Sequence, residues 1–406
     1  MSDTSSSDTS STGRILLFTG KGGVGKTTTA AATALRAARQ GKKTLVLSVD
    51  PAHSLSDALD IKLSPEPQQI TDNLYAQELD VYYSMKKNWG NIRELLLTVF
   101  RWQGLDRIQA EEFATLPGME EASAFLWLDQ YVQEKSFDLI VVDSAPTGET
   151  LTFLTLPQVT QWWMQKAFPL QRSAFKSFGA MTRMTTGIPL DKGYVEMEVL
   201  FDKLERIRDV MSDPNVTSMR IVTNPERMVI NESQRAYTYL QLYGYPVDAV
   251  IANRVLPGEM KDSPFADYVA AQQSYLSEIE TSFAPLPVFR VPHLGKEVFG
   301  LDLLEEIGTA LWGDTDPTDV FHREQSYKVV EDGKRYRLEL RLPLSDEDAP
   351  EAEQFGDMLV VRAGSRRRNL VLPRFLAYYR VAEQRFEDDW LKVWFEEGAP
   401  VAAGRR

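Results

Sequence analysis

A glycine-rich stretch near the start of the chain has the residue types and spacing of a phosphate-binding loop. Residues 20–27 read Gly-Lys-Gly-Gly-Val-Gly-Lys-Thr and match G-x-x-x-x-G-K-[ST]. The glycines allow backbone N–H groups to approach phosphate oxygens, the last lysine reaches the β- and γ-phosphates, and the threonine hydroxyl ligates Mg²⁺. We therefore predict a nucleotide site with Lys26 as a catalytic residue and Thr27 as a metal ligand. Its nucleotide-binding residues are Gly20, Lys21, Gly22, Gly23, Val24, Gly25, Lys26, Thr27 and Thr28.

The segments on either side of this loop suit the motif. Residues 15–19 form a short apolar run, which predicts a buried parallel strand, and residues 29–39 are rich in strong helix formers. A helix that begins at the loop adds a favourable dipole for an anion. A turn that merely connects a strand to a helix would not need the complete motif, so we favour a nucleotide site.

Two further apolar runs end in a carboxylate. Residues 43–50 end in Asp50 and residues 137–143 end in Asp143. The carboxyl ends of parallel strands form the ligand-binding edge of an open α/β sheet. There, Asp50 could orient the attacking water as a catalytic residue, and Asp143 could hold Mg²⁺ through a water. The alternative for Asp50 is a capping residue before a turn.

Composition limits the function classes and the metal chemistry. The 406 residues include 45 basic and 58 acidic residues, a net charge of −13 that argues against nucleic-acid binding. The absence of cysteine excludes disulfides and thiolate metal sites, and three scattered histidines are too few for a convincing metal site. Residues 1–13 lack the features of a signal peptide and predict a disordered tail, and no apolar run has membrane-spanning length. We expect a cytoplasmic protein without stable membrane insertion.

Three motifs together resemble the arsenite-pump and tail-anchored-protein-targeting ATPase family. They are the loop with its additional Lys21, Asp50-Pro-Ala-His-Ser-Leu-Ser-Asp57, and Asp143-Ser-Ala-Pro-Thr-Gly-Glu-Thr. The resemblance implies a homodimer that binds ATP and Mg²⁺, with Lys21 reaching across the interface to the partner's nucleotide as a catalytic residue. It also implies that Asp50 is the catalytic aspartate. Ser144 and Glu149 depart from the family's threonine and histidine.

The same resemblance, over residues 14–312, implies a P-loop ATPase domain with a doubly wound, mostly parallel sheet. In this family we expect Glu226 to lie near the nucleotide, Asn253 to contact adenine, and the loop from Pro292 to close over the base. Residues 85–135 and 153–211 would be helical segments lining a groove for apolar clients. From their own pattern, the same segments could equally be ordinary helical core.

The last part of the chain has a different pattern. Residues 313–325 predict a linker, and residues 326–398 contain six short strands separated by turns, which indicates a small β-sandwich. This domain resembles the small-heat-shock-protein, or α-crystallin, fold. We expect residues 399–406 to form a tail.

The function that we predict is ATP-driven binding and release of hydrophobic client segments, including tail-anchored membrane proteins. A Min/Par-like positioning switch or a regulatory scaffold is the alternative. Arsenite transport would need soft thiolate ligands, which the sequence lacks. The cysteine pair that holds zinc in eukaryotic targeting relatives is also missing, so we expect no zinc.

Overall fold

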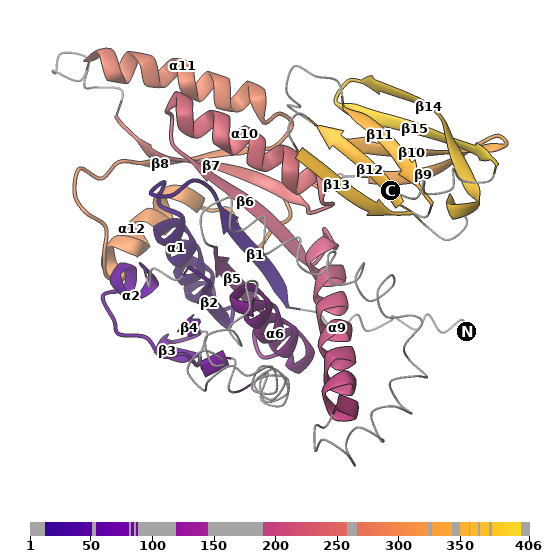
Figure 1. Cartoon of the computed structure of the whole chain (residues 1–406). Helices are drawn as coiled ribbons and strands as arrows, with labels where there is room; N and C mark the ends of the chain where they lie inside the picture. The colour runs from indigo at the N-terminus through magenta and orange to yellow at the C-terminus, as the bar shows by residue number, and fades with distance from the viewer. Residues whose placement is uncertain are drawn as a thin grey trace, which may run out of the picture.

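A computed structural model gives the fold of the chain (Figure 1). It describes residues 13–50, 54–80, 83–84, 87, 119–144, 190–257, 266–323, 327–342, 350–356, 358–363, 366–372 and 376–398. Most of the two segments predicted to form a client groove, and the motif residues 51–53 and 145–150, lie outside this part of the chain.

An eight-stranded sheet forms the centre of the larger domain. Its order is β3-β4-β2-β5-β1-β6-β7-β8, and every pair is parallel except β3 with β4. The predicted doubly wound, mostly parallel sheet is therefore confirmed. The strands are β1 (Arg14–Thr19), β2 (Thr44–Ser48), β3 (Gln68–Thr71), β4 (Leu74–Glu78), β5 (Leu139–Asp143), β6 (Thr217–Thr223), β7 (Val247–Val255) and β8 (Val288–Pro292).

Helices cover both faces of this sheet. One hydrophobic core lies under α1 (Lys26–Arg39), α2 (Ser54–Leu59) and α12 (Leu301–Trp312). The other lies under α6 (Met119–Glu134), α9 (Leu190–Ser212), α10 (Arg227–Leu242) and α11 (Ala266–Ser282).

Strand β1 shows why both faces are closed. Ile15 and Leu17 belong to one core, Leu16 and Phe18 to the other, and all four are fully buried. A strand with two apolar faces is stable only when layers pack on both sides. The central strand thereby places the loop that follows it at the carboxyl edge of the sheet.

The C-terminal domain is a β-sandwich, in which the described residues form seven strands. A four-stranded sheet, β14-β15-β10-β9, packs on a three-stranded sheet, β11-β12-β13, around a shared apolar core. The strands are β9 (Tyr327–Asp332), β10 (Arg335–Arg341), β11 (Glu351–Phe355), β12 (Met358–Ala363), β13 (Arg366–Val371), β14 (Tyr379–Glu387) and β15 (Trp390–Glu397). The sequence predicts six strands and misses β11, an edge strand in which Ala352 is the only buried residue.

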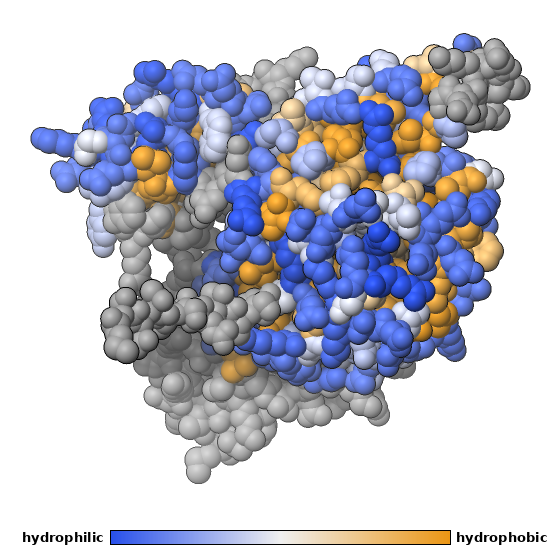
Figure 2. Space-filling view, turned by 180° about the vertical axis from the view of Figure 1, so that it is seen from behind, coloured by the Kyte–Doolittle hydropathy of each residue, from blue (hydrophilic) through white to orange (hydrophobic). Residues whose placement is uncertain are grey.

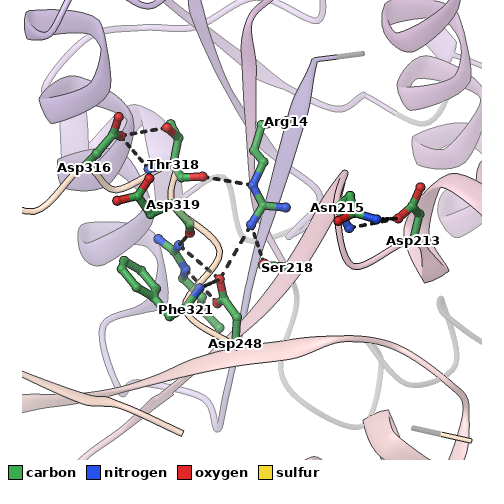
Figure 3. A network of polar contacts seen from close by, with 10 residues as sticks. Arg14, Asp213, Asn215, Ser218, Asp248, Asp316, Thr318, Asp319 and Phe321 are labelled. Carbon is green, nitrogen blue, oxygen red and sulfur yellow. Dashed lines mark hydrogen bonds and ion pairs between the residues drawn. The ribbon is translucent and has the colours of Figure 1, made fainter. Parts of the chain in front are cut away.

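Residues 313–323, predicted as linker, pack against the amino edge of the large sheet (Figure 3). The Thr318 carbonyl accepts a hydrogen bond from Arg14 Nε at 3.0 Å, and the Asp319 carbonyl accepts one from Arg220 at 3.2 Å. Arg220 Nε lies 3.1 Å from Asp248 Oδ1, and both side chains are fully buried. We call this segment, with its partners Arg14, Arg220 and Asp248, the amino-edge network.

The sandwich lies beside α10 (Figure 1). Tyr239 of α10 is part of the sandwich core, and Tyr243 packs against it, so one helix contributes to the cores of both domains. Seen from the side shown in Figure 2, the sandwich is mostly hydrophilic, whereas apolar residues gather on the larger domain. Of the helices that the structure describes, none is long and apolar enough to cross a membrane.

Candidate nucleotide-binding site

The loop between β1 and α1 has a backbone that requires glycine at particular positions. A Cβ atom at Gly20 would lie 2.2 Å from the carbonyl oxygen of Val222, and one at Gly25 would lie 2.2 Å from Asn253 Nδ2. Gly25 also has φ of 94°, in the left-handed region. The loop is therefore held closely against the ends of β6 and β7, and larger residues would displace it.

Helix α1 begins directly at the end of the loop. Gly25 is its N-cap, no side chain caps it, and its first turn contains no acidic residue. The first N–H groups of a helix have no partners within the helix and attract anions. Lys26 is 6% exposed, and its Nζ donates a hydrogen bond to the Lys21 carbonyl at 3.3 Å. These groups place positive charge and N–H donors at one point.

Asp143 lies at the end of β5 beside this point and is completely buried. Its Cα is in register with Phe18 of β1 and with Ser48 of β2, whose hydroxyl donates a hydrogen bond to Asp143 Oδ2 at 3.4 Å. Burial raises the pKa of Asp143 to about 7, although a hydrogen bond from Thr27 and the charge of Lys26 oppose this. Asp143 Oδ1 has no hydrogen-bond partner within the described residues.

A buried carboxylate oxygen without a partner fits a metal-bound water. Buried polar atoms are otherwise almost always paired, and the usual ligands of Mg²⁺ are oxygens. Thr27 and Asp143 supply a hydroxyl and a carboxylate at the same end of the sheet. Thr27 Oγ1 also lies 2.9 Å from Ser54 Oγ of α2. The residues present therefore fit the predicted Mg²⁺ ion.

Asp50 follows β2 and is half-buried. Its N–H donates a hydrogen bond to Ser48 Oγ at 3.4 Å, and its charge contributes to the raised pKa of Asp143. The structure therefore brings Asp50 close to the loop, Lys26 and Asp143. Asp57 lies on the exposed side of α2.

The three residues expected near the base lie at the exits of the next strands. Glu226 is the exposed N-cap of α10 after β6, and Pro292 is exposed at the end of β8. Asn253 is 7% exposed on β7, and its Nδ2 donates a hydrogen bond to the Val24 carbonyl at 2.8 Å. In this structure, Asn253 thus supports the loop directly.

Asn224 was not predicted as a site residue but lies at the same edge. With its amide nitrogen turned toward the neighbouring acceptors, it donates to the Val24 carbonyl at 3.2 Å and to the Thr223 carbonyl at 3.3 Å. Its place directly after β6 was the only available signal. Asn224 and Asn253 therefore both hold Val24, the loop residue between two glycines.

The side chain of Lys21 contacts α10. Its Nζ lies 3.4 Å from Glu232 Oε2, and both side chains are about one third exposed. The expected position of Lys21 at a partner's nucleotide requires a second chain, and the contact within one chain is with Glu232. The sequence did not indicate this pairing, because the two residues are far apart in the chain.

The fold and the loop define this protein as a P-loop ATPase, and comparison with known proteins gives its family. Residues 13–313 match the family model described as "Anion-transporting ATPase", and residues 333–395 match "HSP20-like domain found in ArsA". The chain therefore belongs to the anion-transporting ATPase family and carries the HSP20-like domain found within it. The expected resemblances of both domains are confirmed.

Three relatives illustrate what this chain is similar to. It is 37% identical over 393 residues to "Putative arsenical pump-driving ATPase 1" of Aquifex aeolicus, which covers 94% of this chain and 99% of that protein. It is 38% identical over 388 residues to "Putative arsenical pump-driving ATPase" of Chlorobaculum tepidum, which covers 94% and 96%. It is 31% identical over 315 residues to "ATPase get3" of Pyrenophora tritici-repentis, which covers 73% and 91%. These names agree on ATP hydrolysis as the activity.

Proposed function

We propose that this chain is a homodimeric, Mg²⁺-dependent ATPase that closes with ATP to bind hydrophobic client segments and opens after hydrolysis to release them. The observation that carries the ATPase part is the buried carboxylate of Asp143, one oxygen of which has no hydrogen-bond partner among the residues that the structure describes. Such an oxygen is costly unless a ligand completes it. ATP with its metal ion would complete it.

Each residue at the carboxyl edge would have a defined part in the reaction. The N–H groups of the loop and of the first turn of α1 would hold the phosphates, and Lys26 would stabilise negative charge on the transferred phosphoryl group. Asp50 would orient the attacking water. Thr27 directly, and Asp143 through a water, would hold Mg²⁺, which supplies charge neutralisation at the β- and γ-phosphate oxygens when bound.

Lys21 would act only in the dimer, where it would reach the partner subunit's nucleotide. Glu226, Asn253 and Pro292 would surround the base, for which Asn253 must exchange its hydrogen bond to Val24. The resemblance to tail-anchored-protein-targeting ATPases, together with the relative named "ATPase get3", supports membrane-protein segments as clients in the cytoplasm. Arsenite as cargo is disfavoured because the sequence has no cysteine to supply thiolate ligands.

A defined client tests this function directly. A reporter protein with a C-terminal transmembrane segment would be synthesised in a membrane-free translation system with the purified full chain, ATP and Mg²⁺. Asp50→Asn should trap the complex, because nucleotide would bind without efficient hydrolysis. A matched reporter, in which polar residues replace the apolar segment, measures background binding.

The expected result is a complex of two ATPase chains with the apolar reporter, formed by Asp50→Asn and not by Lys26→Ala. Equal recovery of both reporters would contradict client recognition by apolar segments. An ATP-dependent dimer that ignores the apolar reporter would favour the positioning or scaffold function instead.

A further inference from the structure

The loop lysine Lys21 has a partner within its own chain. Its ammonium nitrogen lies 3.4 Å from Glu232 Oε2 on the second turn of α10. The backbone carbonyl of the same lysine accepts the hydrogen bond from Lys26 at 3.3 Å. Lys21 therefore has its main chain engaged with the nucleotide loop and its side chain engaged with a neighbouring helix.

Glu232 is carried on a helix that is firmly fixed to the sheet. Ile230 is fully buried in the core, and Ser233 is buried with its hydroxyl 3.0 Å from Thr223 Oγ1 of β6. These two neighbours face the sheet, while Glu232 faces the loop and remains about one third exposed. The position of the carboxylate is thus set by α10, and the long lysine side chain is the component that can move.

The solvent exposure of the ion pair determines how strongly Glu232 can hold Lys21. An ion pair between partly exposed side chains contributes a factor of about five at most, because water and salt compete with it. Such a contact biases the lysine toward one position and still allows it to leave. A stronger acceptor, such as the polyphosphate of a nucleotide, would displace the carboxylate.

We propose that Glu232 is a positioning residue that holds Lys21 on its own subunit until the dimer closes. In the open state Lys21 stays on α10, and on closure it exchanges the Glu232 carboxylate for the phosphates of the partner's nucleotide. This inference rests on the ATP-dependent dimer of the proposed function. Because the closed dimer breaks two such pairs, the contact opposes closure and sets the ATP and protein concentrations at which closure occurs.

Glu232→Gln tests this role by removing the charge while keeping the size of the side chain. Sedimentation velocity would measure the dimer dissociation constant of the full chain with a non-hydrolysable ATP analogue and Mg²⁺. Each pair can account for up to about fivefold, so the two pairs predict a dimer up to about 25-fold tighter than wild type. In 0.5 M NaCl this difference should largely disappear.

Two further variants separate this role from a general effect of charge. Glu278→Gln removes the same charge from an exposed position on α11 and should leave the dissociation constant within twofold of wild type. When Lys21→Gln is already present, adding Glu232→Gln should not change the dimer dissociation constant further. Thermal unfolding of each variant confirms that it folds.

The outcomes distinguish a failure of the proposed ATP-dependent dimer from a failure of the positioning role of Glu232. A wild-type chain that never dimerises with nucleotide would contradict the proposed function. If wild type dimerises while Glu232→Gln shifts nothing or weakens the dimer, the positioning role alone is overturned. The same tightening with or without Lys21 would also overturn it.

Discussion

The carboxyl and amino edges of the large sheet each contain a buried aspartate, and the two aspartates differ in their hydrogen-bond and ion-pair partners. At the carboxyl edge, Asp143 is fully buried, and one of its oxygens has no hydrogen-bond partner in the described part of the chain. At the amino edge, Asp248 is equally buried but lies 3.1 Å from Arg220 and 3.6 Å from Arg14, and it accepts a hydrogen bond from the Phe321 N–H at 3.4 Å (Figure 3). Burial and residue type are therefore the same, and the difference is whether the described residues supply hydrogen-bond partners for both carboxylate oxygens.

Under the proposed function, this difference separates a structural charge from one that a bound ligand would complete. Paired buried ions stabilise the fold as a unit and are strongly missed when one partner is removed. A buried carboxylate with an unfilled oxygen weakens the unliganded protein and is retained only where binding offsets the cost. Variants at the carboxyl edge should therefore mainly change ATP hydrolysis, and variants at the amino edge should mainly change the free energy of unfolding.

The largest effect should come from the carboxyl edge. Lys26→Ala removes the only side-chain cation that the described structure buries beside Asp143, and we expect ATP hydrolysis to fall by at least about 100-fold, as when a charge-stabilising donor is lost. The variant should remain folded at the assay temperature. Steady-state ATPase assays and calorimetry test these two expectations. Retained activity would show that the loop is not part of the catalytic site.

At the amino edge, Asp248→Asn should destabilise the protein strongly. It leaves the fully buried Arg220 without its charged partner, for which we expect a loss of about 3–5 kcal/mol in the free energy of unfolding. Urea denaturation measures this loss. ATP turnover per folded molecule, assayed well below the melting temperature, should stay within twofold of wild type. A selective loss of turnover would contradict the structural role of this edge.

Titration of Asp143 should contribute to the pH dependence of the free energy of unfolding. Its pKa rises from 3.8 to about 7 on folding, so the folded protein binds more protons than the unfolded one between these values. Neutral Asp143 therefore contributes to the free energy of unfolding below pH 3.8, and this contribution is lost as the pH rises through about 7. This loss corresponds to about 4 kcal/mol.

Asp143→Asn should abolish that component of the pH dependence. In the absence of nucleotide and metal, we expect the variant to be less stable or similar to wild type near pH 5 and more stable at pH 8. Urea denaturation across this range gives the comparison. Parallel stability curves for the two proteins would show that Asp143 already has its partners.

The smallest effect should come from a partly exposed pair that joins Lys42 to residues 313–323 at the amino edge. Lys42 Nζ lies 2.9 Å from Asp316 Oδ2, and both side chains are about one third exposed. Lys42→Ala should cost about 1 kcal/mol or less, with ATP hydrolysis unchanged. This substitution is the matched control for Lys26→Ala, since it removes a lysine from the other edge. A loss of activity would show that the two edges are coupled.

The sequence predicts those parts of the molecule whose signals are local. The apolar run before Gly20, the glycine spacing and the helix that begins at Lys26 occur in one continuous stretch, and the confirmed sheet follows from several such runs. Asp50 and Asp143 were likewise predicted as site residues from their places at strand ends. Each of these inferences needed only neighbouring residues and a regular period.

Features that depend on distant partners were missed. Strand β4 includes the buried side chains of Gln77 and Glu78, which form hydrogen bonds with Tyr131 and with Ser56. The strand pattern gave no sign of them. Residues 313–323 have the composition of a linker, yet Arg14, Lys42 and Arg220 bind them from positions up to 304 residues away. The pairing of Lys21 with Glu232 belongs to the same class, because nothing local predicts it.

A side-by-side assay of Asp143→Asn and Asp248→Asn tests the distinction between the two edges most directly. Both changes replace a fully buried carboxylate by an amide of the same shape, and ATP hydrolysis would be measured as a function of Mg²⁺ concentration. The account predicts that Asp248→Asn, kept folded at low temperature, follows the wild-type Mg²⁺ curve. It predicts that Asp143→Asn loses activity or needs far more Mg²⁺. A wild-type curve for Asp143→Asn together with an impaired one for Asp248→Asn would contradict it.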